Sequence, residues 1–120
     1  MGVKNYKDLV AYQESYTLCL EIYKLTDEFP KSEIYGLTSQ IRRSAVSIPS
    51  NIAEGYRRMG ANDYRYFLKI AMGSCAELET QLTLSIDLKY ADENIGKSLL
   101  QKIDRITGLL FGLLKSIPPK

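Results

Sequence analysis

Apolar side chains recur at spacings of three and four residues along almost the whole chain, and no stretch alternates in the pattern of a β-strand. Such spacings place residues on one face of an α-helix. Breaks divide the pattern into four helices. The first covers about residues 6–28, the third 62–89 and the fourth 92–117. The second begins somewhere between residues 32 and 38 and ends at about residue 58. Because short connections between long helices make neighbours antiparallel, the sequence predicts an all-α, antiparallel up-down-up-down four-helix bundle, with residues 1–120 as a single domain.

Two residues are unusual inside the predicted helices. Pro49 interrupts the second helix, where proline costs about 3 kcal/mol, but the apolar stripe from Leu37 to Tyr56 keeps its phase across it. This continuity favours one helix kinked at Pro49; the alternative is a new helix capped by Ser47 with Pro49 in its first turn. Gly73 lies inside the third helix at a cost of about 1 kcal/mol relative to alanine, so we expect a neighbouring backbone to approach it closely.

Basic side chains concentrate in the middle of the chain. Residues 31–70 contain seven Lys or Arg residues and three Asp or Glu residues, so this segment has a charge of +4 within a chain of +2. A local basic field attracts phosphate even when the whole protein is nearly neutral. One guanidinium group can also bind two phosphate oxygens in a bidentate contact. The residues predicted to bind nucleic acid are Arg43, Arg57, Arg58, Arg65 and Lys69. The alternative is that these side chains only solvate helix surfaces or pair with carboxylates.

Tyrosines lie between these basic residues. Tyr56, Tyr64 and Tyr66 alternate with the arginines around the second turn of the bundle, and aromatic rings of this kind stack on bases of single-stranded nucleic acid. Arginine with tyrosine is also frequent at protein interfaces, so the pattern alone leaves both uses open.

The adjacent Arg42 and Arg43 point about 100° apart around their helix. One of them is therefore expected near the edge of the core. We predict a structural ion pair between Arg42, or Arg43, and Glu77 or Glu79 of the third helix. A partly buried pair of this kind would fix the register of the bundle more than it would add to stability.

The first helix has a wider apolar face than one helix contact needs. One stripe contains Tyr12, Tyr16 and Tyr23, and a second apolar stripe runs beside it. Excess apolar surface often marks an interface, and homo-oligomers with closed symmetry are common. These three tyrosines are therefore the predicted oligomer interface. The alternative is that they flank the core of a monomer with their hydroxyls in water.

Several function classes are excluded by missing residues. Histidine is absent, which removes the commonest general base and metal ligand, and no glycine-rich phosphate loop is present. The sequence thus predicts no enzyme activity, no metal site and no cofactor. Cys19 and Cys75 fall on apolar helical positions and are expected to be buried thiols. No signal peptide or membrane-spanning run is found, so the expected location is cytoplasmic.

Specific blocks of sequence resemble a known family. They are Tyr6–Leu9, Phe29–Pro30, Tyr35–Gly55, Gly73–Ser74 and Glu77–Leu82. Through them the chain resembles the bacterial 23S rRNA-intervening-sequence proteins, also called the S23 ribosomal protein family. A related branch contains the accessory variability protein of diversity-generating retroelements, a homopentameric barrel that binds nucleic acid and a reverse transcriptase. The resemblance implies a four-helix bundle, a pentameric ring, and RNA or a nucleic-acid-processing protein as partner.

These observations lead to two functional hypotheses. The first is a non-catalytic RNA or nucleoprotein binding module that acts as a homo-oligomeric ring. The second is a protein-interaction scaffold without affinity for nucleic acid. Salt separates them, because binding to phosphates weakens steeply as salt rises, whereas an apolar contact responds little.

Overall fold

The computed structural model describes residues 5–118, and no strand occurs in this range. Its long helices are α1 (Val10–Thr26), α2 (Leu37–Arg57), α3 (Ala61–Asp87) and α4 (Glu93–Ser116). Two short 3-10 helices precede the first two of them, η1 (Tyr6–Asp8) before α1 and η2 (Lys31–Glu33) before α2. The predicted all-α class is confirmed.

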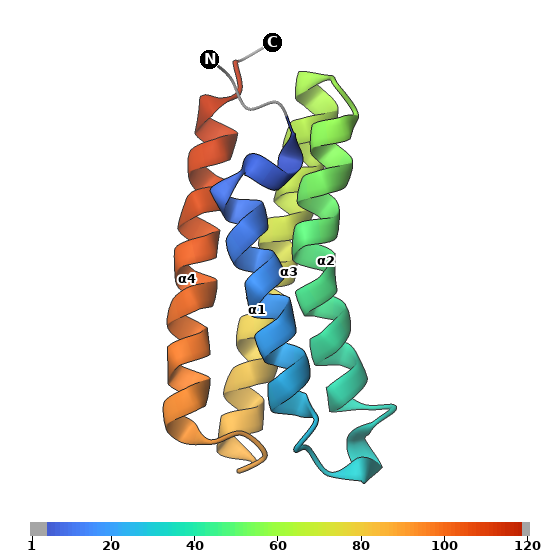
Figure 1. Cartoon of the computed structure of the whole chain (residues 1–120), viewed down its shortest axis with the longest axis vertical. Coiled ribbons are helices and arrows are strands. Elements are labelled where there is room, and N and C mark those ends of the chain that lie inside the picture. The colour runs from blue at the N-terminus through green and yellow to red at the C-terminus, as the bar shows by residue number, and fades with distance from the viewer. Residues whose placement is uncertain (1–4, 119–120) are drawn as a thin grey trace.

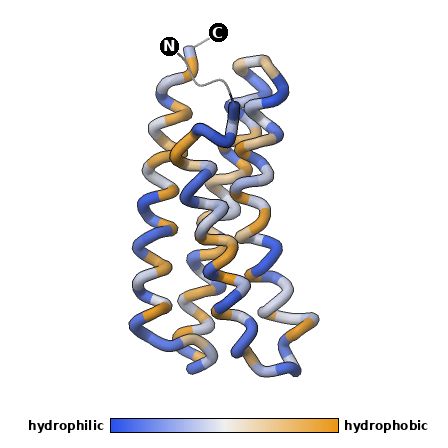
Figure 2. The backbone as a smooth tube through the Cα atoms, in the orientation of Figure 1, coloured by the Kyte–Doolittle hydropathy of each residue, from blue (hydrophilic) through white to orange (hydrophobic). Residues whose placement is uncertain are grey.

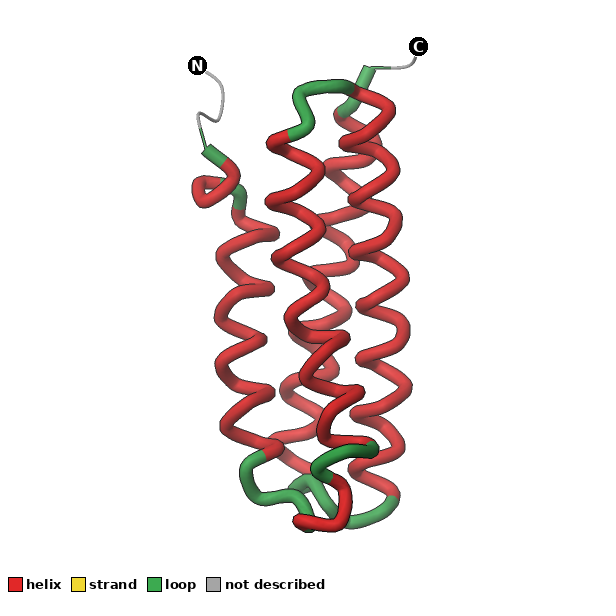
Figure 3. The backbone as a smooth tube through the Cα atoms, turned by 90° about the vertical axis from the view of Figure 1, so that its right-hand side faces the viewer, coloured by secondary structure: helices red, strands yellow, loops and turns green. Residues whose placement is uncertain are grey.

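The helices form an elongated bundle with extents of 46 × 25 × 21 Å. Each helix packs against the next along the chain, and α4 packs against α1, so that the four helices close around one core. Consecutive helices run in opposite directions (Figure 1), and the view turned by 90° shows the same parallel alignment of their axes (Figure 3). The predicted up-down-up-down four-helix bundle is confirmed.

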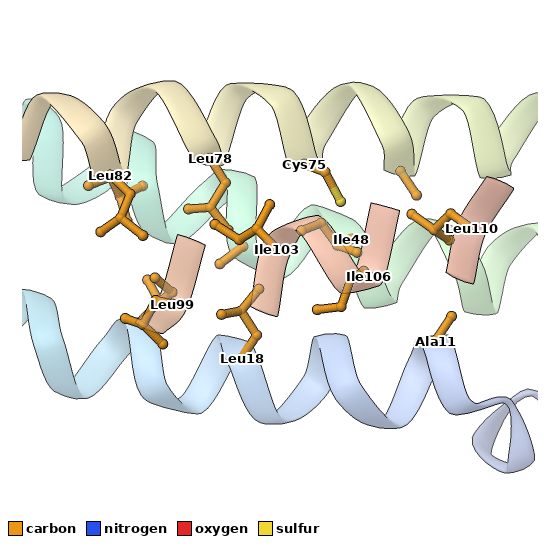
Figure 4. Close-up of a cluster of buried hydrophobic side chains, with 14 of the residues drawn as sticks. Ala11, Leu18, Ile48, Cys75, Leu78, Leu82, Leu99, Ile103, Ile106 and Leu110 are labelled. Atoms are coloured by element: carbon orange, nitrogen blue, oxygen red, sulfur yellow. The ribbon is translucent and has the colours of Figure 1, made fainter. Parts of the chain in front are cut away.

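The core is a continuous column of aliphatic side chains from all four helices. Leu18 of α1, Ile48 of α2, Leu78 of α3 and Ile106 of α4 are almost completely buried and meet in its centre (Figure 4). Along each helix, apolar residues recur every three or four positions, with polar residues between them (Figure 2). Burying a large aliphatic side chain stabilises the fold by about 1.5–3 kcal/mol, so this column is the main source of stability.

The beginning of the first helix differs from the prediction. A single helix was expected from Tyr6, but Leu9 has extended backbone (φ −72°, ψ 129°) and separates η1 from α1. Asn5 caps η1 instead, because its side chain accepts a hydrogen bond from the Lys7 amide at 2.9 Å. The break buries the Leu9 side chain and lays η1 against α2. Packing at the end of the bundle therefore overrides the local helical pattern.

The second helix runs without interruption through Pro49. The alternative of a new helix beginning near Ser47 is therefore wrong, while the kink at Pro49 stays a prediction. Gly36 is the N-cap of α2 and has no side chain to cap it, and Glu33 of η2 supplies an acceptor instead: its Oε1 accepts a hydrogen bond from the Leu37 amide at 3.0 Å. A carboxylate at a helix N-terminus also interacts favourably with the helix dipole.

Candidate nucleic-acid interface

All five basic residues predicted to bind nucleic acid lie on the antiparallel pair α2 and α3. Arg57 ends α2, Arg58 follows it in the turn, and Arg65 and Lys69 lie in the first part of α3. The turn between α2 and α3 is at the same end of the bundle as η1 and the end of α4 (Figure 1). Arg43 lies 14 residues before Arg57 on α2, roughly 20 Å away along the helix axis.

Arg57 and Arg58 face different neighbours. The guanidinium of Arg57 lies over the ring of Tyr6 in η1, with 5.4 Å between its central carbon and the ring centroid. Arg58 lies over Phe67 of α3 at 5.1 Å and donates two hydrogen bonds to one carboxylate oxygen of Glu54. The two arginines therefore spread positive charge to both sides of α2.

Arg65 is held by neutral oxygen atoms. It donates to the side-chain oxygen of Asn62 at 3.0 Å and to the carbonyl of Pro118, just beyond α4, at 2.7 Å. Lys69 and Arg43 are exposed and form no ion pair with a carboxylate of residues 5–118.

The charge of this surface is therefore largely uncompensated. Within residues 5–118, Arg58 has a carboxylate partner closer than 4 Å, whereas Arg43, Arg57, Arg65 and Lys69 do not. A structural role in ion pairs explains one of the five side chains. The other four present positive charge to solvent or to a ligand.

The tyrosines near these arginines differ in their availability for stacking. Tyr56 and Tyr64 pack edge to face with ring centroids 5.8 Å apart, and burial raises the pKa of Tyr64. Tyr66 is 60% exposed, although one side of its ring meets Phe67. Tyr66 is therefore the ring of the three that is open enough to meet a base.

The predicted ion pair between Arg42 and Glu77 or Glu79 is not formed. Arg42 instead reaches the end of α1, where its Nε donates to Thr26 Oγ1 at 2.8 Å and its Nη2 donates to the Tyr23 carbonyl at 3.4 Å. Its guanidinium also lies 4.6 Å from the centroid of the Tyr23 ring. The C-terminus of a helix carries partial negative charge, so α1 offers Arg42 more acceptors than one carboxylate of α3 would. Arg43 forms no ion pair with Glu77 or Glu79 either.

A polar groove of about 600 Å³ follows the seam between α2 and α3. Arg43 and Glu77 line it from opposite helices, together with Ser44, Ser47 and Gln81. Ser47 Oγ lies 2.7 Å from Ser74 Oγ across the seam, and Asn51 Nδ2 donates to Ser47 Oγ at 2.8 Å. Hydroxyl and amide groups thus line this seam, whereas most other helix contacts of the bundle are apolar.

Sequence reasoning missed this groove. The predicted site residues include Arg43 and Glu77, but none of the serines of this groove and not Gln81. The usable signal was the spacing of Gln40, Ser44 and Ser47, which are four and three residues apart and therefore share one face of α2. Helical spacing alone could not show that Glu77 and Gln81 lie opposite that face.

The predicted interface tyrosines line a second, mainly apolar groove of about 340 Å³ between α1 and α2. Tyr16 is 51% exposed and Tyr23 44% exposed, whereas Tyr12 is half-buried and packs against Tyr6 and Tyr16. Leu20 also lines this groove and is 60% exposed. The structure therefore brings the three tyrosines together along one groove.

Residues 5–118 contain neither a cluster of metal-ligating side chains nor a membrane-spanning helix. Among residues 5–118, no group of three or more Cys, Asp or Glu side chains is close enough to hold a metal ion. Over the same range, no helix combines the length and apolar character that crossing a bilayer requires. Cys19 and Cys75 are free thiols whose pKa values are raised by burial, which disfavours the reactive thiolate.

Comparison with known proteins identifies the family. No curated protein matches the chain significantly. The chain is similar over 89% of its length to the whole of a crystal structure from Bacteroides thetaiotaomicron, a protein of unknown function from the S23 ribosomal protein family, with a TM-score of 0.80 and 26% identity. The family model for the 23S rRNA-intervening sequence protein matches residues 7–112. The chain therefore belongs to the 23S rRNA-intervening sequence protein family.

Proposed function

We propose that this protein is a non-catalytic RNA-binding module whose RNA surface lies along α2 and α3. The observation that carries the proposal is the uncompensated charge of Arg43, Arg57, Arg65 and Lys69 on two adjacent helices. Exposed guanidinium and ammonium groups bind the phosphate backbone without needing a deep pocket. The family's association with 23S rRNA-intervening sequences is consistent with an RNA partner.

The proposal includes assembly into a homo-oligomeric ring, with five subunits as the expected number. Its support is the apolar groove between α1 and α2, where Tyr16, Leu20 and Tyr23 remain exposed. A second copy that covers these side chains would remove apolar surface from water. A ring would also repeat the basic surface, and several weak phosphate contacts on one assembly increase the total affinity.

The same groove supports a second candidate function, a protein-interaction scaffold without affinity for nucleic acid. In that case Arg57 and Arg58 would bind a partner protein, and the apolar groove would provide most of the binding free energy. Such a complex would respond little to salt, whereas log K for single-stranded RNA falls with a slope of about −0.7 per phosphate contact as log salt rises.

Retention of RNA by the double variant Arg57→Glu/Arg58→Glu tests the proposal. We expect wild-type protein to retain single-stranded RNA on a filter at low salt and the variant to lose retention, because two cations become anions at the end of α2. Circular dichroism should show that the variant keeps its helices, since both side chains are exposed.

The matched control is Lys89→Glu/Lys97→Glu, which changes the charge by the same amount around the connection between α3 and α4, at the opposite end of the bundle. This control should retain RNA nearly as well as wild type. Absence of retention by wild-type protein at low salt would overturn the proposed function and favour the scaffold.

A further inference from the structure

The groove between α2 and α3 holds a cation and a carboxylate that do not pair with each other. Arg43 of α2 and Glu77 of α3 both line it, yet no ion pair shorter than 4 Å joins them. Neither side chain has another charged partner among residues 5–118. The groove therefore presents a strong donor on one helix and a strong acceptor on the other, and a ligand that fits must satisfy both.

Neutral polar groups add to these two charges. Gln81 Oε1 is shielded from solvent and accepts no hydrogen bond from residues 5–118. Ser44 is buried, and the Ser47 hydroxyl is oriented by Ser74 and Asn51. The volume of about 600 Å³ lies within the range of about 300–1,000 Å³ that is usual for small-molecule sites.

We propose that this groove binds one guanine nucleotide of a single-stranded RNA. The inference rests on the proposed RNA-binding function and names the base that the surface reads. Glu77 accepts the two adjacent N–H groups of the guanine Watson–Crick edge, and Arg43 binds a phosphate oxygen.

Guanine is selected by the chemistry of the carboxylate. An ionised carboxylate has two acceptor oxygens and no donor. Guanine offers two neighbouring donors, N1–H and the N2 amino group, whereas adenine and cytosine each place a ring-nitrogen acceptor beside their amino group, and uracil places a carbonyl on each side of N3–H. Only guanine satisfies both oxygens of Glu77 without bringing two acceptors together.

The surroundings suit a base that is turned out of a single strand. Tyr35 lines the groove and is 95% exposed, so its ring is available for stacking. Sequence-specific proteins read unpaired bases through such stacking and through hydrogen bonds to the Watson–Crick edge. Arg58, directly after α2, lies 15 residues beyond Arg43, roughly 22 Å along the helix axis, so the strand can continue along the seam toward the basic end of the bundle.

The test compares two fluorescein-labelled heptauridylates, one with a central guanosine and one with a central adenosine, by fluorescence anisotropy at low salt. We expect wild-type protein to prefer the guanosine probe by about tenfold, the usual effect of one good bidentate base contact. Glu77→Gln should remove most of this preference, because the amide replaces one acceptor with a donor. Arg43→Gln should lower the affinity for both probes by the same factor. It should also reduce the salt dependence of binding by the amount expected for about one phosphate contact.

Glu79→Gln is the matched control, because Glu79 is exposed on the same helix but does not line the groove; it should keep the guanosine preference. Equal affinity of wild type for both probes overturns this inference and leaves the proposed function standing. A preference that survives Glu77→Gln also overturns it, because the guanine would then be recognised by other residues than Glu77. Failure to bind either probe overturns the proposed function and this inference together.

Discussion

Arg58 and Glu54 lie one helical turn apart on α2, and Arg58 directs both its Nε and its Nη2 at the same Glu54 oxygen, at 3.0 and 2.8 Å. Both side chains are about half exposed. An exposed pair of this type is worth no more than about 1 kcal/mol. Glu54 thus reduces the field of one cation on the proposed RNA surface while adding little to stability.

Removing this carboxylate charge should strengthen RNA binding. We expect Glu54→Gln to raise the affinity for single-stranded RNA by about two- to fivefold at low salt. In this variant RNA binding no longer has to break the ion pair of Arg58, which stabilises the free protein by up to about 1 kcal/mol. Filter binding across a salt series measures both the affinity and its slope, which should become steeper.

Glu93→Gln provides the control for net charge. Glu93 forms an equivalent pair with Lys97 one turn along α4, at 2.8 Å and with both side chains 65% exposed. Its removal changes the charge of the protein by the same amount away from the basic end. Equal gains for the two variants would show that total charge, and not the surface along α2 and α3, controls binding.

Oligomer formation should depend on Tyr16. We expect Tyr16→Glu to dissociate the assembly, because a carboxylate in the apolar groove between α1 and α2 would have to be desolvated on contact with a second copy. Multi-angle light scattering measures the mass. Met59→Glu serves as control, since Met59 is 93% exposed in the turn after α2 and lies outside this groove. A monomeric wild type would contradict the proposed ring.

Two glycines should respond to alanine in opposite directions. A Cβ at Gly55 would lie 2.7 Å from the Cβ of Phe67, so Gly55→Ala should destabilise the bundle by about 1–3 kcal/mol, as overpacking does. A Cβ at Gly73 would meet nothing within 4 Å, so Gly73→Ala should stabilise it by about 0.5–1 kcal/mol. Urea unfolding of both variants measures these changes, and effects of the same sign would contradict the close packing at Gly55 and the open space at Gly73.

The contact between Tyr90 and Glu33 predicts a dependence of stability on alkaline pH. The Tyr90 hydroxyl donates to Glu33 Oε2 at 3.0 Å, and this bond raises the pKa of Tyr90 above its ordinary value of 10.0. Because the folded pKa is higher than the unfolded one, the stabilisation is complete below about pH 10 and is lost as pH rises through the folded pKa. Tyr90→Phe should therefore be less stable than wild type at neutral pH.

Urea unfolding at neutral and alkaline pH tests this contact. The difference in stability between wild type and Tyr90→Phe should shrink as pH rises above 10. Tyr66→Phe is the control, because Tyr66 is exposed on α3 and its hydroxyl donates to no carboxylate of residues 5–118. A constant difference at all pH values would show that the hydrogen bond to Glu33 contributes nothing that depends on ionisation.

Much of the fold follows from the sequence alone. The stripe from Leu37 to Tyr56 predicts both the second helix and its buried face, and the structure buries its aliphatic members, while Tyr56 at its end is half-buried. The fourth helix was expected from residue 92, and Asp92 is its N-cap, whose side chain accepts a hydrogen bond from the Ile95 amide at 3.0 Å. These features are local, because helical period and capping depend on residues only a few positions apart.

The expectations that failed concern contacts between distant parts of the chain. Gly73 was expected to admit a close neighbour, but two other helical glycines do so, Gly55 against Phe67 and Gly96 against Ile86. Arg42 was expected to pair with α3 but binds the end of α1, 16 residues earlier at Thr26. Helical period shows which face of a helix is apolar, but it does not show which neighbour the edges of that face will meet.

The sequence by itself determined the number and order of the four long helices, the buried stripes and the concentration of positive charge on residues 31–70. Only the tertiary structure decided that Arg42 binds the end of α1 and not a carboxylate of α3, and that Arg43 and Glu77 line one groove with Gln81. The physical reason is that helix formation is governed by neighbouring residues. The partner of a side chain depends instead on how each helix is rotated and shifted against the others, which the packing of the whole core sets.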